Sequence, residues 1–216
     1  MKTALLLVDA TPTFMPEGEL PVPEGDAIVH PTQRLIREGD FDEVVDVREE
    51  HPLGHISFAS THGQAPFTTK VINGAEEVLW PDHAIEGTAN AKLHPELAKE
   101  RITLTVLKGL RKDAVCYGGF EYADGVPTGL RTELKKRGVE KVVIVGLATD
   151  YCVAMTALQA IRNGFETEII LEGCRGVAPE TTAAAIKKMR EAGINITPTV
   201  NAFLKTLRTE KNLPTL

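Results

Sequence analysis

The sequence predicts a three-layer α/β/α protein built on a central, mostly parallel sheet of about six strands. Short apolar runs rich in β-branched residues recur along the chain, and segments of helical character alternate with them. This alternation is typical of strand–helix–strand units, in which helices cover both faces of the sheet. With 216 residues, 43% of them apolar, the chain can bury a substantial core, and we expect residues 1–216 to form a single domain.

Three strands are predicted in the first half of the chain. Thr3–Val8 is a continuous apolar run after its first residue. Phe41–Val47 and Ile102–Leu107 are segments of similar length that are rich in β-branched residues. A helix is predicted at Asp26–Glu38. Residues 49–99 show little periodicity and contain five of the six histidines. Because long irregular segments in compact domains are usually functional, we expect this loop region to carry part of a site.

The second half of the chain alternates more regularly. A helix at Thr128–Arg137 ends before Gly138, a typical C-cap residue. A helix at Pro179–Ala192 has proline in its first turn and glycine beyond its end. The remaining predicted strands are Lys141–Gly146, Phe165–Leu171 and Asn195–Pro198. Two further helices are predicted, one directly after Cys152 and one at Val200–Arg208.

Composition excludes several classes of protein. The net charge of −6, without a basic stripe, argues against a nucleic-acid binder. No apolar run approaches the roughly 18–20 residues of a membrane helix, so no membrane association is expected. The three cysteines form neither a disulfide framework nor a paired zinc-ligand spacing, and we expect a reducing cytoplasmic location.

Charged and nucleophilic residues follow four of the predicted strands. Asp9 follows the first strand, Glu49 and His51 the second, Lys108 the third and Cys152 the fourth. Ligands of open parallel sheets bind at the carboxyl ends of the strands. We therefore expect these side chains to meet at one edge of the sheet.

Cys152 is the candidate nucleophile, because it lies where a buried strand gives way to a helix. The positive end of the helix dipole should lower the pKa of its thiol and favour the thiolate. Asp9 is the candidate general base, and Lys108 is a cation that would favour the thiolate. The alternatives are a buried structural cysteine, an aspartate that caps a turn and a solvated lysine. Cys116 and Cys174 are assigned structural roles, although Cys116 could border a pocket.

Glu49 and His51 are a candidate metal-binding pair. Residues two apart in an extended segment point to the same side, so this carboxylate and imidazole could share one ion. His83, in the tetrad Trp80–His83 (WPDH), is the candidate third ligand. Such donors suit Zn²⁺, Mn²⁺ or Fe²⁺ and leave room for water or substrate. An isolated Glu-x-His pair is more often a surface feature, and these residues alone leave that alternative open.

Three segments together resemble the nicotinamidases, which belong to the isochorismatase-like cysteine hydrolases. They are GLATDYCV at 146–153, WPDH at 80–83 and EHPLGHISFAS at 50–60, and the resemblance extends from about residue 3 to residue 177. It implies an isochorismatase-like, Rossmann-like fold. It also implies hydrolysis of nicotinamide to nicotinate and ammonia through a thioester, a reaction of NAD salvage. Family habit allows a homo-oligomer.

The resemblance also implies roles for individual residues. The catalytic triad of the family matches Asp9, Lys108 and Cys152. A cis peptide bond is expected at Leu147–Ala148, with an oxyanion hole formed by the backbone N–H groups of Ala148 and Cys152. The metal ligands match Glu49, His51 and His83, and the expected cofactor is a divalent ion, Zn²⁺ ahead of Mn²⁺ or Fe²⁺. The substrate-binding residues would be Phe14, Trp80, Tyr117 and Leu147.

Several positions depart from the family pattern. Glu49 stands where aspartate is usual, and residues 10–13 (ATPT) replace Val-Gln-Asn-Asp. Glu50 replaces an aromatic residue, Ala84 a cysteine, and Cys116–Phe120 a segment that usually contains serine. We expect these changes to border the pocket and to affect the choice of substrate. The alternatives are a related hydrolase of a different small amide and a binding protein without turnover, which the intact triad disfavours.

Overall fold

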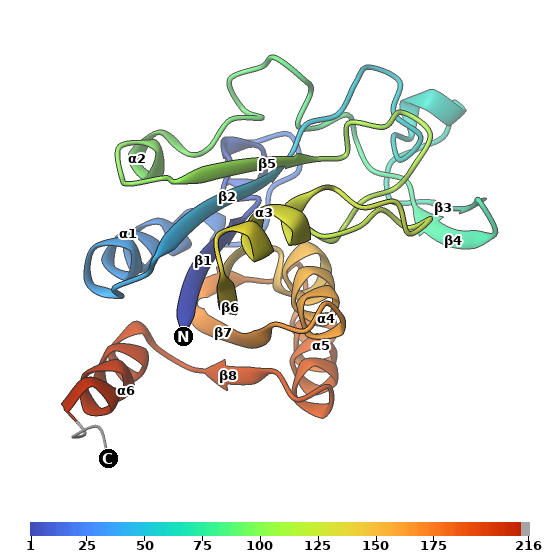
Figure 1. Ribbon diagram of the computed structural model, residues 1–216. Coiled ribbons are helices and arrows are strands. Elements are labelled where there is room, and N and C mark those ends of the chain that lie inside the picture. Colours follow the sequence, from blue (N-terminus) through green and yellow to red (C-terminus); the bar gives the residue numbers. More distant parts are fainter. Residues whose placement is uncertain (213–216) are drawn as a thin grey trace.

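The computed structural model describes residues 1–212 and contains a six-stranded parallel sheet (Figure 1). Its strand order is β5-β2-β1-β6-β7-β8. The strands are β1 (Lys2–Val8), β2 (Glu43–Glu49), β5 (Leu104–Lys108), β6 (Val139–Leu147), β7 (Glu166–Arg175) and β8 (Asn195–Thr197). The predicted fold class and all six predicted strands are therefore confirmed, with ends displaced by up to four residues.

Helices cover both faces of the sheet. One group, which includes α1 and α6, lies on one face, and α3, α4 and α5 lie on the other (Figure 1). The helices are α1 (Val29–Glu38), α2 (Pro95–Ala98), α3 (Leu130–Lys136), α4 (Ala154–Arg162), α5 (Pro179–Glu191) and α6 (Val200–Asn212). The aliphatic side chains of β1 and β6 are almost entirely buried between these layers and form the centre of the core. Within residues 1–212, no helix combines the length and apolar character that crossing a membrane requires.

The helix predicted at Asp26–Glu38 is divided into two parts. A short 3₁₀ turn at Gly25–Ile28 precedes α1. The physical reason is Pro31, which has no N–H to donate to the carbonyl of Ala27. Regular α-helical hydrogen bonding therefore cannot extend backward past this proline, and the chain forms a tighter turn there instead.

The region at 49–99 contains more structure than we predicted. Its main element is a β-hairpin formed by β3 (Thr69–Ile72) and β4 (Ala75–Val78). Asn73 and Gly74 join the two strands, and both have positive φ angles, 51° and 87°. Asn-Gly is the preferred pair for this type of two-residue turn. The prediction of an irregular loop was therefore wrong here, although the turn signal was present in the sequence.

The parallel register places the ends of the central strands side by side. Glu49 is the direct cross-strand partner of Lys108. The N–H of Asp9, just after β1, donates to the carbonyl of Val47 on β2, 2.8 Å away. On the other side of β1, β6 is its parallel neighbour and ends at Leu147, close to Cys152 in the chain. The residues predicted to carry chemistry therefore share one edge of the sheet.

Candidate active site

Cys152 lies in a tight turn between β6 and α4. The turn is a short π-helical segment, Thr149–Val153, and a cis peptide bond joins Leu147 to Ala148 immediately before it, as expected. The carbonyl of Ala148 accepts hydrogen bonds from the N–H groups of Tyr151 and Val153. Asp150 anchors the outside of the turn, since its carboxylate accepts the N–H groups of residues 177 and 178. This local structure holds the cysteine at the carboxyl edge of the sheet.

Three buried charged side chains meet beneath the cysteine. Lys108 Nζ lies 3.0 Å from Asp9 Oδ2, 2.6 Å from Glu49 Oε1 and 3.6 Å from Cys152 Sγ. Sγ lies 3.6 Å from Glu49 Oε1 and within 4.8 Å of an Asp9 carboxylate oxygen. Asp9 Oδ1 accepts the backbone N–H of Glu49 at 2.8 Å. The structure thus brings the predicted triad together and adds Glu49 as its fourth member.

The charges in this cluster set the protonation of its members. Burial raises the pKa of Asp9 to about 7, against the opposing attraction of Lys108. Burial also opposes ionisation of Glu49, but Lys108 and the adjacent His51 and His83 outweigh it and hold the pKa of Glu49 well below its ordinary value. Asp9 can therefore gain or lose a proton near neutral pH, while Glu49 stays ionised.

Burial and nearby charges, and not the predicted helix dipole, determine the pKa of the Cys152 thiol. Burial raises the pKa of the Cys152 thiol well above its ordinary value; Lys108 lowers it, and the carboxylates of Glu49 and Asp9 raise it further. The resting thiol is therefore neutral, contrary to the sequence-based expectation. The reason is tertiary: residues distant in sequence bury the sulfur and place two carboxylates beside it. A thiol in this state can act as a nucleophile only if a base removes its proton.

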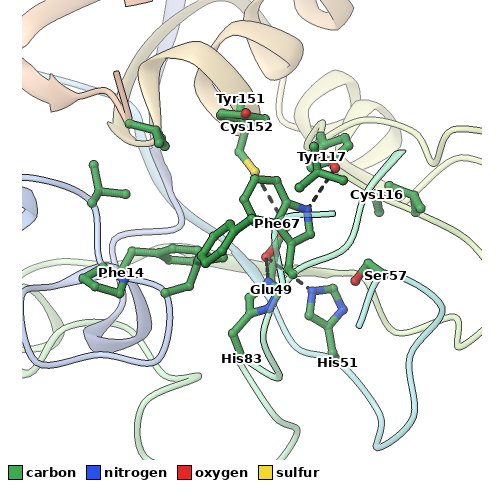
Figure 2. Close-up of a pocket in the computed structure, with 18 of the residues that line it drawn as sticks. Phe14, Glu49, His51, Ser57, Phe67, His83, Cys116, Tyr117, Tyr151 and Cys152 are labelled. Carbon is green, nitrogen blue, oxygen red and sulfur yellow. Dashed lines mark hydrogen bonds and ion pairs between the residues drawn. The ribbon is translucent and has the colours of Figure 1, made fainter. Parts of the chain in front are cut away.

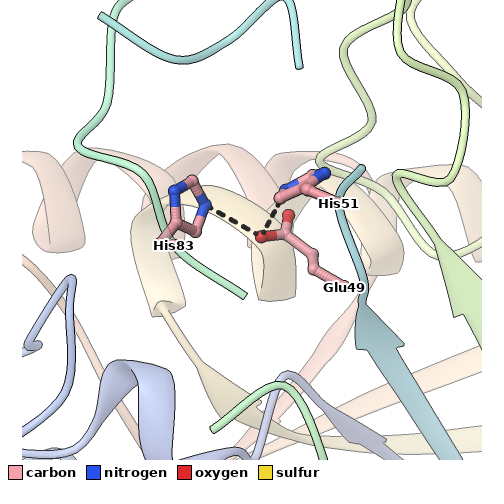
Figure 3. A group of neighbouring side chains, drawn as sticks. All are labelled: Glu49, His51 and His83. Atoms are coloured by element: carbon pink, nitrogen blue, oxygen red, sulfur yellow. Dashed lines mark hydrogen bonds and ion pairs between the residues drawn. The ribbon is translucent and has the colours of Figure 1, made fainter. Parts of the chain in front are cut away.

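Glu49, His51 and His83 form a second cluster beside the first (Figure 3). Their ligand atoms all lie within 4.8 Å of one another, and all three residues are buried. Glu49 Oε2 is 3.3 Å from Nε2 of each histidine, whereas its other oxygen faces Lys108. One carboxylate therefore joins the two clusters.

Both histidines are oriented for metal binding by backbone carbonyls. His51 Nδ1 lies 2.9 Å from the carbonyl oxygen of Gly109, and His83 Nδ1 lies 2.8 Å from that of Pro81. Since a carbonyl only accepts, each Nδ1 carries the hydrogen, which leaves the Nε2 lone pair of the neutral ring free to bind a cation. Gly109 is required here, because a Cβ on it would lie 2.4 Å from His51 Cε1. The residues present therefore fit a divalent cation.

His55, which belongs to the same histidine-rich segment, has a structural role. Its ring lies 4.2 Å from that of His51, centroid to centroid. However, its Nε2 faces the carbonyl of Ala114 at 3.2 Å, and its Nδ1 accepts the N–H of Ser57. Burial and the neighbouring His51 lower the pKa of His55 to about 4. It is thus a neutral side chain whose two nitrogens are already engaged.

A cavity of about 510 Å³ opens above both clusters (Figure 2). Phe14, Trp80 and Tyr117, three of the predicted substrate-binding residues, line it, and Trp80 Nε1 donates to the Tyr117 hydroxyl at 3.0 Å. Leu147 does not line it: its side chain is fully buried in the core beneath the turn. Asp9 and Lys108 lie behind Cys152 and Glu49 with no exposed surface. The lining residues that sequence reasoning missed are Leu20, Pro21, Val22, Pro23, Ser57, Phe67, Val78, Val115, Tyr151 and Val177.

Most of the departures from the family pattern lie away from this cavity. Of the described residues, those at 10–13 do not line it, and neither do Glu50 and Ala84. Glu50 instead pairs with Arg48 at 3.3 Å, and the carbonyl of Ala84 accepts the N–H of His51. Our expectation that these changes border the pocket was wrong for them. It was correct for Cys116, which lines the cavity beside Tyr117, and for Glu49.

Residues 3–200 match the isochorismatase domain family. This chain belongs to the isochorismatase family. It is 36% identical over 198 residues to a nicotinamidase of Escherichia coli, covering 89% of this chain and 93% of that one. A nicotinamidase/pyrazinamidase structure from Acinetobacter baumanii has a TM-score of 0.88 and 37% identity, covering 93% of this chain and 97% of the other. A pyrazinamidase from Pyrococcus horikoshii, solved in complex with zinc, has a TM-score of 0.75 and 33% identity, covering 91% and 99%.

Proposed function

We propose that this isochorismatase-family protein is a nicotinamidase, which hydrolyses nicotinamide to nicotinate and ammonia in NAD salvage. The observation that carries this proposal is the pair of clusters joined by Glu49. A cysteine with a base and a buried cation suits acyl transfer, and an adjacent donor set for a metal suits a ring that contains a basic nitrogen. The nicotinamidases with which this chain aligns over most of its length support the choice of substrate.

We further propose that Zn²⁺ is the ion held by Glu49, His51 and His83. Two histidines and one glutamate are a known donor set of catalytic zinc sites, in which a remaining position is open to water or substrate. The zinc complex of the Pyrococcus horikoshii relative favours Zn²⁺ over Mn²⁺ or Fe²⁺. Bound there, the ion would supply an open coordination position for the pyridine nitrogen. Phe14, whose ring meets that of His83 edge-on at 5.9 Å, would pack against the substrate ring.

In the proposed first half-reaction, Asp9 accepts the proton of the Cys152 thiol and the sulfur attacks the amide carbon. Asp9 is suited to this task because burial raises its pKa to about 7. Lys108, which contacts both groups, compensates the negative charge as the proton moves. The N–H groups of Ala148 and Cys152 are the proposed oxyanion hole, and a donor of this kind typically contributes about 10²–10³ in rate.

Collapse of the tetrahedral adduct breaks the carbon–nitrogen bond and leaves a thioester on Cys152. Asp9 returns its proton to the departing nitrogen, so that ammonia leaves as a neutral molecule. In the second half-reaction Asp9 accepts a proton from water, and the resulting hydroxide attacks the thioester carbonyl. The sulfur leaves and regains a proton from Asp9, so the site returns to its starting state. Nicotinic acid is released and loses its own proton to water, which gives nicotinate.

The proposal is tested by incubating the purified protein with nicotinamide and measuring ammonia and nicotinate together. We expect equimolar products, loss of turnover in a Cys152→Ala variant, and a change in unfolding free energy of less than about 1 kcal/mol for that variant. Treatment with a chelator should abolish activity, and Zn²⁺ should restore it.

Two outcomes would contradict the proposal. A fully active Cys152→Ala variant would exclude the cysteine as nucleophile. Hydrolysis of another small amide by the zinc-loaded protein, without hydrolysis of nicotinamide, would support instead a related amide hydrolase with a different substrate. The presence of Cys116 in the cavity wall is the observation that keeps this second function under consideration.

A further inference from the structure

The cavity is larger than nicotinamide requires. Nicotinamide has nine non-hydrogen atoms, and even at the roughly 30 Å³ that a water molecule occupies in the liquid it would fill only about half of the 510 Å³. Cavities of this size usually hold larger ligands. About half of the cavity therefore stays open when nicotinamide is bound.

The chemistry of the substrate defines which part of the cavity stays open. The metal-binding cluster and Cys152 are adjacent, since Glu49 contacts both, so the ring nitrogen and the amide carbon must lie against the same wall. The ring nitrogen and the ring carbon that bears the amide are separated by a single ring carbon. The ring position meta to both of them, the 5-position, therefore points directly away from that wall. A substituent there would extend into the open part of the cavity.

The outer part of the cavity has rigid apolar walls. One wall is Leu20–Pro23, which contains two prolines and is held by hydrogen bonds from the N–H of Leu20 to the carbonyl of Thr13 and from the N–H of Val22 to that of Phe14. The prolines restrict the backbone, so this wall is formed before a ligand arrives. Val177 and Val78 add further apolar surface.

A second part of the cavity lining is aromatic and includes Phe67. Trp80 meets Tyr151 edge-on at 5.3 Å, and Phe67 meets Trp80 edge-on at 6.1 Å. Phe67 is 65% exposed, and its φ angle of +67° lies in the left-handed region that phenylalanine rarely adopts. Because it lines the cavity, its ring offers apolar surface to a ligand there.

The backbone of Phe67 is nevertheless firmly held. Its N–H donates to the carbonyl of Leu79, and the N–H of Leu79 donates to the carbonyl of Thr68 at 2.8 Å, which extends the pairing of the β3–β4 hairpin. Leu79 is fully buried in a small core with Ile72 and Val115. The fold therefore presents an exposed aromatic ring in a fixed place at the mouth of the cavity.

We propose that the outer part of the cavity is a subsite for an apolar substituent at the 5-position of the pyridine ring, and that Phe67 determines its selectivity. The inference rests on the proposed hydrolysis of nicotinamide and extends the substrate class to 5-alkyl nicotinamides. The substituent would lie between the Leu20–Pro23 wall and the exposed face of Phe67, and covering that face would remove apolar surface from water.

The test compares nicotinamide with 5-propylnicotinamide as substrates of the zinc-loaded protein. The wild type should hydrolyse both, with the propyl compound having the lower KM. In a Phe67→Ala variant, the KM for the propyl compound should rise about tenfold relative to the KM for nicotinamide, the effect of losing contacts with roughly two methylene groups. The ratio of the two kcat values should stay the same, because Phe67 lies away from the reacting atoms.

Val71→Ala is the matched control. Val71 lies on the same hairpin and is 68% exposed, but it does not line the cavity, so its substitution should leave the ratio of KM values unchanged. Thermal unfolding of both variants verifies that they fold. The subsite is refuted if the wild type hydrolyses nicotinamide but not the propyl compound, or if Phe67→Ala affects both substrates equally. Absence of nicotinamide hydrolysis by the wild type would refute the proposed function itself, and this inference with it.

Discussion

Replacing Lys108 by methionine should destabilise the protein strongly, although the two side chains have similar shapes. Lys108 is fully buried, and its ammonium lies 2.6 Å from one carboxylate (Glu49) and 3.0 Å from another (Asp9). Methionine would fill the space but leave two buried carboxylates without a cation. Removing one partner of a buried ion pair typically costs about 3–5 kcal/mol. At about 2–4 °C per kcal/mol for a protein of this size, Tm should fall by about 6–20 °C.

The size of the effect should depend on pH. The pKa of Asp9 is already raised to about 7, and loss of Lys108 would raise it further, so this carboxyl would take up a proton and lose its charge. The destabilisation should therefore be larger at about pH 8 than at about pH 6. Urea unfolding, followed by the fluorescence of Trp80, the single tryptophan, measures it at both values.

A matched surface variant controls for the loss of a lysine. Lys136 is 64% exposed and pairs with Glu133 at 2.9 Å, so Lys136→Met should change the unfolding free energy by less than about 0.5 kcal/mol. If Lys108→Met also costs less than about 1 kcal/mol at pH 8, the buried ion-pair cluster does not have the charges assigned to it here.

Two further predictions concern the metal ligands and the base. Gly109→Ala should weaken Zn²⁺ binding about 10–100-fold, because a Cβ there displaces His51. A competition titration with a coloured chelator measures this affinity, and an unchanged value would exclude the orientation assigned to the His51 ring. The kcat/KM for nicotinamide should fall about tenfold per pH unit below about pH 7, because protonated Asp9 cannot accept the thiol proton. A kcat/KM that stays level down to about pH 5 would argue against Asp9 as the base.

Local sequence patterns were sufficient for most of the sheet. Strands such as β1 and β6 are buried on both faces, so they appear as continuous apolar runs that few other structures would tolerate. The β3–β4 hairpin was missed because six of its eight strand residues are charged or exposed and its strands are short, although the Asn73-Gly74 turn indicated it. The register that pairs Glu49 with Lys108 could not be predicted, because it depends on which strands become neighbours.

The sequence by itself determined the fold class, the order of the six sheet strands and the charged and nucleophilic residues that meet at one edge of the sheet. Those properties follow from apolar periodicity and from the rule that parallel strands end at one edge of the sheet. Only the tertiary structure decided the protonation of Cys152 and the linking role of Glu49, whose two oxygens face different clusters. Burial and the distances between charges set these properties, and both depend on residues far apart in the chain. The outer cavity wall at Phe67 has the same origin, since its exposure and position are consequences of packing that no local pattern encodes.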